Sequence, residues 1–233
     1  MNMSIEKTPA FSEETFTFLF ELAANNEREW FHANKHRYEE LVREPALAFI
    51  EAMASELEVI SPHFTASPKK VGGSLMRVYR DTRFSRDKTP YKTNIGIQFR
   101  HELGRDVHAP GYYLHISLDE CFLGAGIWHP ASAELGRIRK AINDQPKAWK
   151  MACDDVHFNE AFQLSGDRLK RAPAGYVMDH PLLEDLKRKD HIAICNLDAD
   201  NILSKDFPMF AGERFAAASP YMRFLCKALN LSF

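Results

Sequence analysis

The segment from Gly111 to Trp128, G-Y-Y-L-H-I-S-L-D-E-C-F-L-G-A-G-I-W, predicts a β-hairpin. In its first half, apolar residues alternate with Tyr113, His115 and Ser117, a pattern that is typical of a strand buried on one face. The second half begins after only two residues and is again apolar, with two glycines. Two strands joined by so short a connection are expected to pair as an antiparallel hairpin.

The turn of this hairpin sets which residues face each other. If Asp119-Glu120 form a two-residue turn, His115 lies opposite Gly124 and Tyr113 lies opposite Gly126. This register keeps the apolar side chains on one face, whereas a slip by one residue would turn them to the other. Glycines opposite a histidine and a tyrosine leave the backbone bare, so we expect a depression in which a ligand could lie against the sheet. The alternative is that the tryptophan at the end of the segment, or a helix, fills this space and the histidine is merely packed.

Helical and strand patterns divide the whole chain into three parts. Strands are expected where apolar and polar residues alternate or apolar runs are short, near residues 74–80, 93–101, 111–118, 121–128 and 191–197. Helices are expected where apolar residues recur every three or four positions after a Ser or Pro start. We therefore predict a single α+β domain over residues 1–233 with a mostly antiparallel sheet, helical over 12–60, sheet over 71–130, and helical with one strand over 131–233.

Composition limits the class of protein. The 233 residues are 45% hydrophobic and include 17 Phe, which is enough to fill a core. Four cysteines stand without a C-x-x-C pair, so we expect reduced thiols and neither a zinc ribbon nor a thioredoxin-type redox motif. The first ten residues show no apolar signal-peptide core, and no stretch reaches the length of a membrane-spanning helix. A cytoplasmic protein without a membrane partner is therefore expected.

The strongest functional signal is a cluster of positive charge. Residues 69–92 carry eight Lys/Arg and two Asp, a local balance of +6, within a chain whose net charge is −2. The remaining 209 residues must therefore sum to −8. A field of one sign concentrates ligands of the other sign, so the segment predicts an anion-binding site.

The basic loop, residues 77–92, has the chemistry of an oxyanion clamp. Arginine supplies bidentate donors that suit phosphate and carboxylate groups. We predict a small anionic, phosphate-bearing ligand between the basic loop and the polar face of the sheet. The predicted ligand-binding residues are Arg77, Arg80, Arg83, Lys88, Tyr91, Lys92, Tyr113 and His115. The alternative is a solvated loop in which Asp81 and Asp87 pair with neighbouring cations and no ligand binds.

Catalytic and metal-binding patterns are sparse. His115 is the only candidate acid or base in the predicted site, since the pKa of an ordinary histidine is near neutral. The sequence has no P-loop, G-x-G-x-x-G fingerprint or G-x-S-x-G elbow, so it leaves open whether the protein is an enzyme and which cofactor it uses. His32 and His36 have a ligand spacing, but no third helical ligand follows, and we predict no metal site. Three further histidines at strand ends or in loops could gather around a metal: His101, His108 and His129.

Several motifs resemble a widespread family of conserved hypothetical proteins from bacteria and fungi, a domain of unknown function. The most specific one is R-V-Y-R-D-T-R-F-S-R-D-K-T-P-Y-K-T over residues 77–93. The others are E-W-F-x-x-N-K-x-x-Y (29–38), G-Y-Y-L-H (111–115), G-A-G-I-W (124–128) with Pro130, and G-D-R-L-K-R (166–171). The resemblance covers residues 11–229 and implies a single cytoplasmic domain. It carries no catalytic role to any residue.

Two other functions compete with the small anionic ligand. Phe84 and Tyr91 lie among the cations and could stack on bases, which would suit a nucleic-acid-associated protein. The acidic remainder of the chain weakens that interpretation. The basic segment could instead dock an acidic protein partner, in which case the domain is an interaction module. The sequence does not indicate an oligomeric state.

Overall fold

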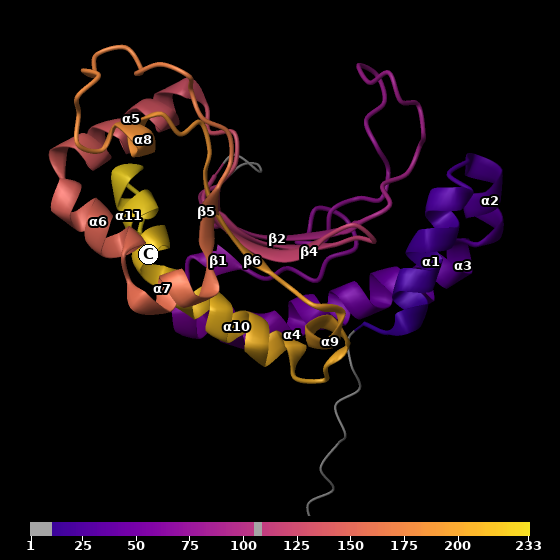
Figure 1. The fold of residues 1–233 in the computed structure, drawn as a ribbon. Helices are drawn as coiled ribbons and strands as arrows, with labels where there is room; N and C mark the ends of the chain where they lie inside the picture. Colours follow the sequence, from indigo (N-terminus) through magenta and orange to yellow (C-terminus); the bar gives the residue numbers. More distant parts are fainter. Residues whose placement is uncertain (1–10, 105–108) are drawn as a thin grey trace, which may run out of the picture.

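One antiparallel sheet of six strands forms the middle of the molecule (Figure 1). The computed structural model describes residues 11–104 and 109–233. The strands are β1 Phe64–Thr65, β2 Ile95–His101, β3 Gly111–Ile116, β4 Cys121–Ile127, β5 Gln163–Ser165 and β6 His191–Asn196. Their order is β1-β2-β3-β4-β6-β5, and every neighbouring pair is antiparallel. The predicted α+β class with a mostly antiparallel sheet is confirmed.

Helices cover one face of the sheet and flank both of its ends. The N-terminal set is α1 Glu13–Ala24, α2 Arg28–Ala33, α3 Lys35–Tyr38, the π-helix η1 Glu39–Arg43 and α4 Glu44–Ile60. The others are α5 Ser132–Asp144, α6 Pro146–Cys153, α7 Val156–Ala161, α8 Leu183–Leu186, α9 Ala199–Leu203, α10 Phe207–Ala217 and α11 Ser219–Ala228. In Figure 1, α4, α9 and α10 lie beneath the sheet, α1 to α3 lie beyond one end, and α5, α6 and α8 lie beyond the other. Within the described residues, no helix is long and apolar enough to cross a membrane.

The core lies between the sheet and the helices beneath it. Alternation along the strands directs Leu114, Ile116 and Leu123 to this side, and all three are fully buried. Phe49 of α4 stacks on Phe207 of α10 with the ring centroids 5.0 Å apart. Full burial of a side chain of this size contributes roughly 1.5–3 kcal/mol relative to exposure, so these faces hold the helices on the sheet.

The hairpin of β3 and β4 forms, but its register differs from the predicted one. His115 lies opposite Phe122, and Tyr113 lies opposite Gly124, so the pairing is shifted by two residues. The reason is the turn: residues 117–120 form a four-residue loop, in which the Ser117 hydroxyl donates to the Glu120 carbonyl at 2.9 Å. A shift by two residues leaves every side chain on its face, so the predicted polar face is preserved.

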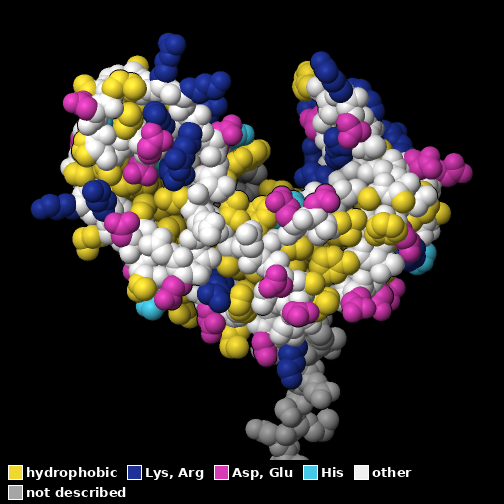
Figure 2. Space-filling view, in the orientation of Figure 1, with side chains coloured by type: hydrophobic (Ala, Val, Ile, Leu, Met, Phe, Trp, Pro, Cys, Tyr) yellow, Lys and Arg dark blue, Asp and Glu magenta, His cyan; other side chains and the backbone are white. Residues whose placement is uncertain are grey.

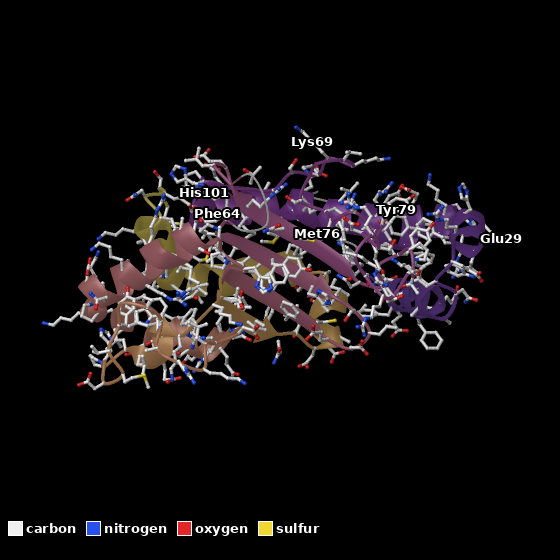
Figure 3. All side chains as sticks on the ribbon, turned by 90° about the horizontal axis from the view of Figure 1, so that it is seen from above. Glu29, Phe64, Lys69, Met76, Tyr79 and His101 are labelled. Carbon is white, nitrogen blue, oxygen red and sulfur yellow. The ribbon has the colours of Figure 1, made fainter. Side chains whose placement is uncertain are left out.

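The predicted strand over residues 74–80 is only partly formed. It pairs with β2 through a single bridge, and the Met76 N–H donates to the Gly96 carbonyl at 2.9 Å. Beyond this point the segment leaves the sheet, because β2 does not extend farther. Seen from above, Met76 lies over the sheet and Tyr79 lies farther out, toward Glu29 of α2 (Figure 3). The basic loop is therefore an arm that starts at the sheet and ends beside the N-terminal helices.

The second face of the sheet is open. The basic loop rises at one end of this face, and the loop over residues 166–182 rises at the other (Figure 1). Figure 2 shows the face as the floor of a hollow between two lobes, with Lys and Arg side chains on both lobes. The open face of the sheet is therefore reached between two lobes that both carry Lys and Arg side chains.

Candidate functional site

The basic loop is anchored at its base. Tyr79 and Tyr91 form an antiparallel bridge between its two legs. The Asn26 side chain, in the turn between α1 and α2, accepts from the Tyr91 N–H at 3.0 Å and donates to the Tyr91 carbonyl at 2.9 Å. The Tyr91 ring stacks on Phe31 of α2 at a centroid distance of 4.0 Å. Tyr91 thus fastens the loop to the helices, and its role as a ligand-binding residue stays a prediction.

The two aspartates of the loop neutralise two of its arginines. Asp81 accepts from Arg83 through Nε at 3.0 Å and Nη2 at 2.7 Å. Asp87 pairs with Arg80, which also contacts the Thr89 hydroxyl. Hydrogen bonds from Arg83 lower the pKa of Asp81 to about 2, and those from the Thr89 N–H and Arg80 lower the pKa of Asp87 to about 2. Asp81 and Asp87 therefore pair with Arg83 and Arg80, and the other cations of the basic loop have no carboxylate partner among the described residues.

A groove of about 680 Å³ lies between the basic loop and the N-terminal helices; we call it the lateral groove. Its charged lining is Glu27, Arg28 and Lys35 from the helical side, and Arg80 and Lys88 from the loop, and His32 also lines it. Tyr79, Phe31 and Tyr91 supply aromatic surface. The Lys88 amino group donates to the Thr82 carbonyl at 2.8 Å. Within the described residues, no carboxylate pairs with Arg28, Lys35 or Lys88.

A second hollow, the floor pocket, lies on the open face of the sheet and has a volume of about 340 Å³. Its principal lining side chains are Met76, Gln98, Tyr113, His115, Phe122, Trp128, Ile192 and Ile194, and the glycines Gly124 and Gly126 also line it. Among the described residues that line it, none is Lys or Arg. The depression predicted beside the glycines therefore exists, and its surface is mainly apolar and aromatic.

Tyr113 and His115 lie side by side in the floor pocket, with the Tyr113 hydroxyl 3.1 Å from Nδ1 of His115. Burial raises the pKa of Tyr113 to about 12 and lowers the pKa of His115 below its ordinary value. The imidazole stacks on Phe122 at 4.9 Å. Near pH 7 both groups are neutral, so they can offer hydrogen bonds to a ligand. The role of His115 as an acid or base stays a prediction.

Arg77 and Lys92 lie close enough to influence each other at the base of the basic loop. Burial and the charge of Arg77 lower the pKa of Lys92. Neither residue has a carboxylate partner within the part of the chain that the structure describes. Two like charges are thus held near each other without a directly paired carboxylate among the described residues, which is unfavourable for the folded state.

Replacing Lys92 with Met tests whether the charge of Lys92 destabilises the folded protein. The folded protein holds the Lys92 proton less tightly than the unfolded chain, so stability rises as the pH passes the lowered pKa and approaches 10.5. Lys92→Met keeps the aliphatic stem and removes the charge. We expect a gain in the free energy of unfolding at pH 7 of no more than about 1 kcal/mol, because solvent screens a half-exposed group. The alkaline rise should also become smaller.

Urea denaturation across this pH range measures both effects. Lys140→Met is the matched control, because Lys140 is exposed and already paired with Asp144. An alkaline rise as large in Lys92→Met as in the wild type would contradict the assignment.

The eight predicted ligand-binding residues are distributed over several places rather than one. The lateral groove is lined by Arg80, Lys88 and Tyr91. The floor pocket is lined by Tyr113 and His115. The remaining three, Arg77, Arg83 and Lys92, line neither the lateral groove nor the floor pocket. Sequence reasoning did not find the contribution of Arg28, His32 and Lys35 to the groove, because these residues are separated from the basic loop by more than 40 positions.

A buried carboxylate joins three segments next to the floor pocket. Asp190 is only 3% exposed at its side chain. One oxygen accepts from the His129 N–H at 2.8 Å and from Nδ1 of the same residue at 2.9 Å. The other oxygen accepts from the Asp167 N–H at 3.0 Å. The His129 ring stacks on Trp128, a lining residue of the floor pocket, at 4.0 Å. Sequence reasoning missed this pair, because 61 positions separate its members.

Within residues 11–104 and 109–233, no group of three or more His, Cys, Asp or Glu side chains is placed to hold a metal ion. His101 contacts the Ser232 carbonyl at 3.0 Å, and His129 is engaged by Asp190. His108 lies outside the described residues. The four cysteines are free thiols, as the sequence predicts.

Comparison with known proteins assigns the chain to a family. The family model described as a conserved hypothetical protein, DUF2461, matches residues 14–224. The chain belongs to the DUF2461 family. The resemblance seen in the sequence is confirmed at this level, and the matched residues span the basic loop, both hollows and Asp190. No curated protein and no solved structure matches the chain.

Proposed function

We propose that the protein binds a small phosphate-bearing anion in the lateral groove. The observation that carries this proposal is the set of Arg28, Lys35 and Lys88, which line one groove without a carboxylate partner among the described residues. Glu27 is the one acidic residue in the described lining. A concave surface with an excess of one charge concentrates ligands of the other, and guanidinium and ammonium groups both suit phosphate oxygens.

The groove suits the anion better than the polar face of the sheet does. The described lining of the floor pocket has no Lys or Arg, so it offers no charge to a phosphate. The volume of the lateral groove, about 680 Å³, lies within the range of small-molecule sites. Tyr79 is half-exposed beside the cations and gives a flat surface for a sugar or a base. The ligand is thus expected to place its phosphate on the cations and its neutral part on Tyr79.

A thermal-shift panel of inorganic phosphate, pyrophosphate, sugar phosphates and nucleotides tests the proposal. A ligand at 100 times its Kd stabilises the folded state by about 2.7 kcal/mol, which raises the Tm of a protein of this size by roughly 5–10 °C. Arg28→Gln and Lys35→Met are expected to abolish the shift. Arg83→Gln is the matched control, because it removes the same charge from a residue that pairs with Asp81.

A panel without any shift would contradict the proposal. If Arg83→Gln reduced the thermal shift as much as Arg28→Gln does, the ligand would respond only to the overall positive charge of this region. That result would also contradict the lateral groove as the binding site.

Single-stranded nucleic acid is a second candidate, and Phe84 is the observation that favours it. The Phe84 side chain is 95% exposed in the basic loop, and the guanidinium of Arg83 lies 5.6 Å from the centre of its ring. An exposed aromatic ring among cations can stack on a base. An oligonucleotide in the same panel separates the two candidates. If it alone stabilises the protein, and Phe84→Ala removes that effect, nucleic acid replaces the small anion.

A further inference from the structure

We propose that the floor pocket binds an uncharged heteroaromatic lactam, a flat ring molecule in which an N–H donor lies beside a C=O acceptor. The floor pocket and the lateral groove share no lining residue among those that the structure describes, so this ligand is separate from the proposed anion. Three features carry the proposal: a floor of glycines, aromatic walls, and a tyrosine–histidine pair that presents one donor and one acceptor.

Three glycines line the pocket and raise no side chain from the sheet. Gly111 and Gly126 lie opposite each other in β3 and β4, and Gly124 lies opposite Tyr113. Residues that pair across strands, or that are two positions apart in one strand, share a face of the sheet. All three glycines therefore belong to the open face. Glycine in a strand often marks a place where a ligand approaches the backbone closely, and a flat ring suits such a floor.

Gly124 is the glycine that the backbone does not require. A Cβ at Gly111 or Gly126 would lie 2.9 Å or 2.0 Å from a backbone oxygen, so both positions need glycine for the pairing of the strands. A Cβ at Gly124 would meet its nearest atom, the Cβ of Tyr113, at 3.5 Å, which is an ordinary contact. The missing side chain at position 124 thus leaves space on the open face without serving the fold.

Aromatic side chains flank this floor. The rings of Tyr113 and Phe122 lie with their centroids 5.9 Å apart, and Trp128, which is 51% exposed, lines the same pocket. Aromatic rings gain energy from stacked and edge contacts beyond simple burial, so these walls favour an aromatic ligand. The described lining contains no Asp, Glu, Lys or Arg. Burial of a charge without a partner is costly, so the ligand is expected to be uncharged.

The pair of Tyr113 and His115 offers one donor and one acceptor in either tautomer of the imidazole. The Tyr113 hydroxyl lies 3.1 Å from Nδ1 of His115, and neither residue has another side-chain hydrogen-bond partner among the described residues. If the hydroxyl donates to Nδ1, then Nε2 carries a proton to donate, and the phenol oxygen can accept. If Nδ1 donates to the hydroxyl, then Nε2 accepts and the phenol donates. A lactam complements both arrangements, because its N–H and C=O are adjacent.

The surroundings of the pocket favour a small molecule over a second copy of the chain. Both lobes beside the open face carry Lys and Arg side chains (Figure 2). Two copies placed face to face would bring these like charges toward each other, which disfavours association. The pocket volume of about 340 Å³ lies at the lower end of the range of small-molecule sites.

Isothermal titration calorimetry with 2-quinolinone, a flat and uncharged lactam of two fused rings, tests the proposal. We expect a Kd of about 1 mM or lower, an affinity that small ligands with good contacts reach. Quinoline-2-carboxylate adds a charge, and decahydroquinolin-2-one keeps the lactam but is not flat. Both should bind at least about 10-fold more weakly. The proposal is overturned if the wild type does not bind 2-quinolinone, or if it binds the carboxylate equally well.

Substitutions at Gly124 locate the ligand. Gly124→Leu places a side chain on the floor and should weaken binding of 2-quinolinone by at least about 10-fold, because the space is then filled. Gly136→Leu is the matched control, since Gly136 lies in α5 and a Cβ there meets no described atom within 4 Å. Its affinity should equal that of the wild type. Gly124→Ala adds only one methyl group and should weaken binding less, and it decides the question if Gly124→Leu does not fold. Wild-type affinity in the folded Gly124 variants would refute the site.

Two further measurements separate this proposal from its alternatives. Tyr113→Phe removes only the hydroxyl and should weaken binding of 2-quinolinone about 5-fold, the effect of one hydrogen bond. Arg28→Gln should leave this binding unchanged, and Gly124→Leu should leave the thermal shift with phosphate unchanged, so either proposal can fail alone. Light scattering reports the oligomeric state. A dimer that becomes monomeric in Trp128→Ser would assign the open face to a second copy and overturn the proposal.

Discussion

Gly126→Ala is expected to lower the free energy of unfolding by about 4 kcal/mol or more. Gly126 has a φ of 128°, which side chains rarely adopt, and a Cβ at this position would lie 2.0 Å from the His191 carbonyl oxygen. That oxygen belongs to β6, which pairs with β4 at this point, so the two strands would have to separate. Backbone strain alone costs about 1–3 kcal/mol, and the lost pairing adds to it. Urea denaturation followed by circular dichroism measures the change, provided the m-value stays constant.

Gly136→Ala is the matched control for this substitution. Gly136 lies within α5, and a Cβ there would meet no atom within 4 Å among the described residues. Alanine has a higher helix propensity than glycine, so we expect a gain of roughly 0.5–1 kcal/mol. If both alanine variants shift stability in the same direction, the contact with His191 is not the cause.

Asp190→Ala is expected to lower the free energy of unfolding by about 3–5 kcal/mol. The substitution removes the acceptor of two backbone N–H groups, from His129 and Asp167, and of the His129 ring. A buried donor left without a partner costs about 1–3 kcal/mol. The variant also frees the loop after β5 from the turn after β4, so we expect faster amide exchange in both segments. Hydrogen exchange and urea denaturation together measure these effects.

Asp144→Ala is the corresponding control. Asp144 is exposed at the end of α5 and pairs only with Lys140 and Asn143 among the described residues. We expect no measurable loss of stability, because exposed ion pairs contribute little. A loss in Asp190→Ala no larger than in this control would show that Asp190 does not hold the segments together.

The sequence predicted the faces of the sheet well and its register less well. Side-chain alternation has a period of two, so Tyr113 and His115 had to share a face whatever the turn was. The register depends on the turn, and the Ser117 hydroxyl closes a longer loop than Asp119-Glu120 suggest. The alternation of residues in the sequence thus determines the face of the sheet on which each side chain lies. Which residues of β3 and β4 lie opposite each other depends on the contact of the Ser117 hydroxyl in the turn.

Contacts between segments that are far apart in the sequence could not be predicted from the pattern of apolar and polar residues within each segment. β6 pairs with β4 although α5, α6, α7, β5 and α8 lie between them in the chain. The same crossing brings Asp190, which directly precedes β6, to His129, which follows β4. The charge of the basic loop could be counted from the sequence. Which of its cations Asp81 and Asp87 neutralise depends on how the loop folds back on itself.

The two outer strands of the sheet have a consequence for behaviour at high concentration. β1 has two residues and β5 has three, so each edge offers few unpaired backbone groups to another chain. Long, flat edges act as templates for aggregation, and shortened edges are a common protection against it. The four inner strands are longer and rich in apolar residues, but each is paired on both sides. The molecule is therefore expected to resist fibril-like self-association, even with one face of its sheet open to solvent.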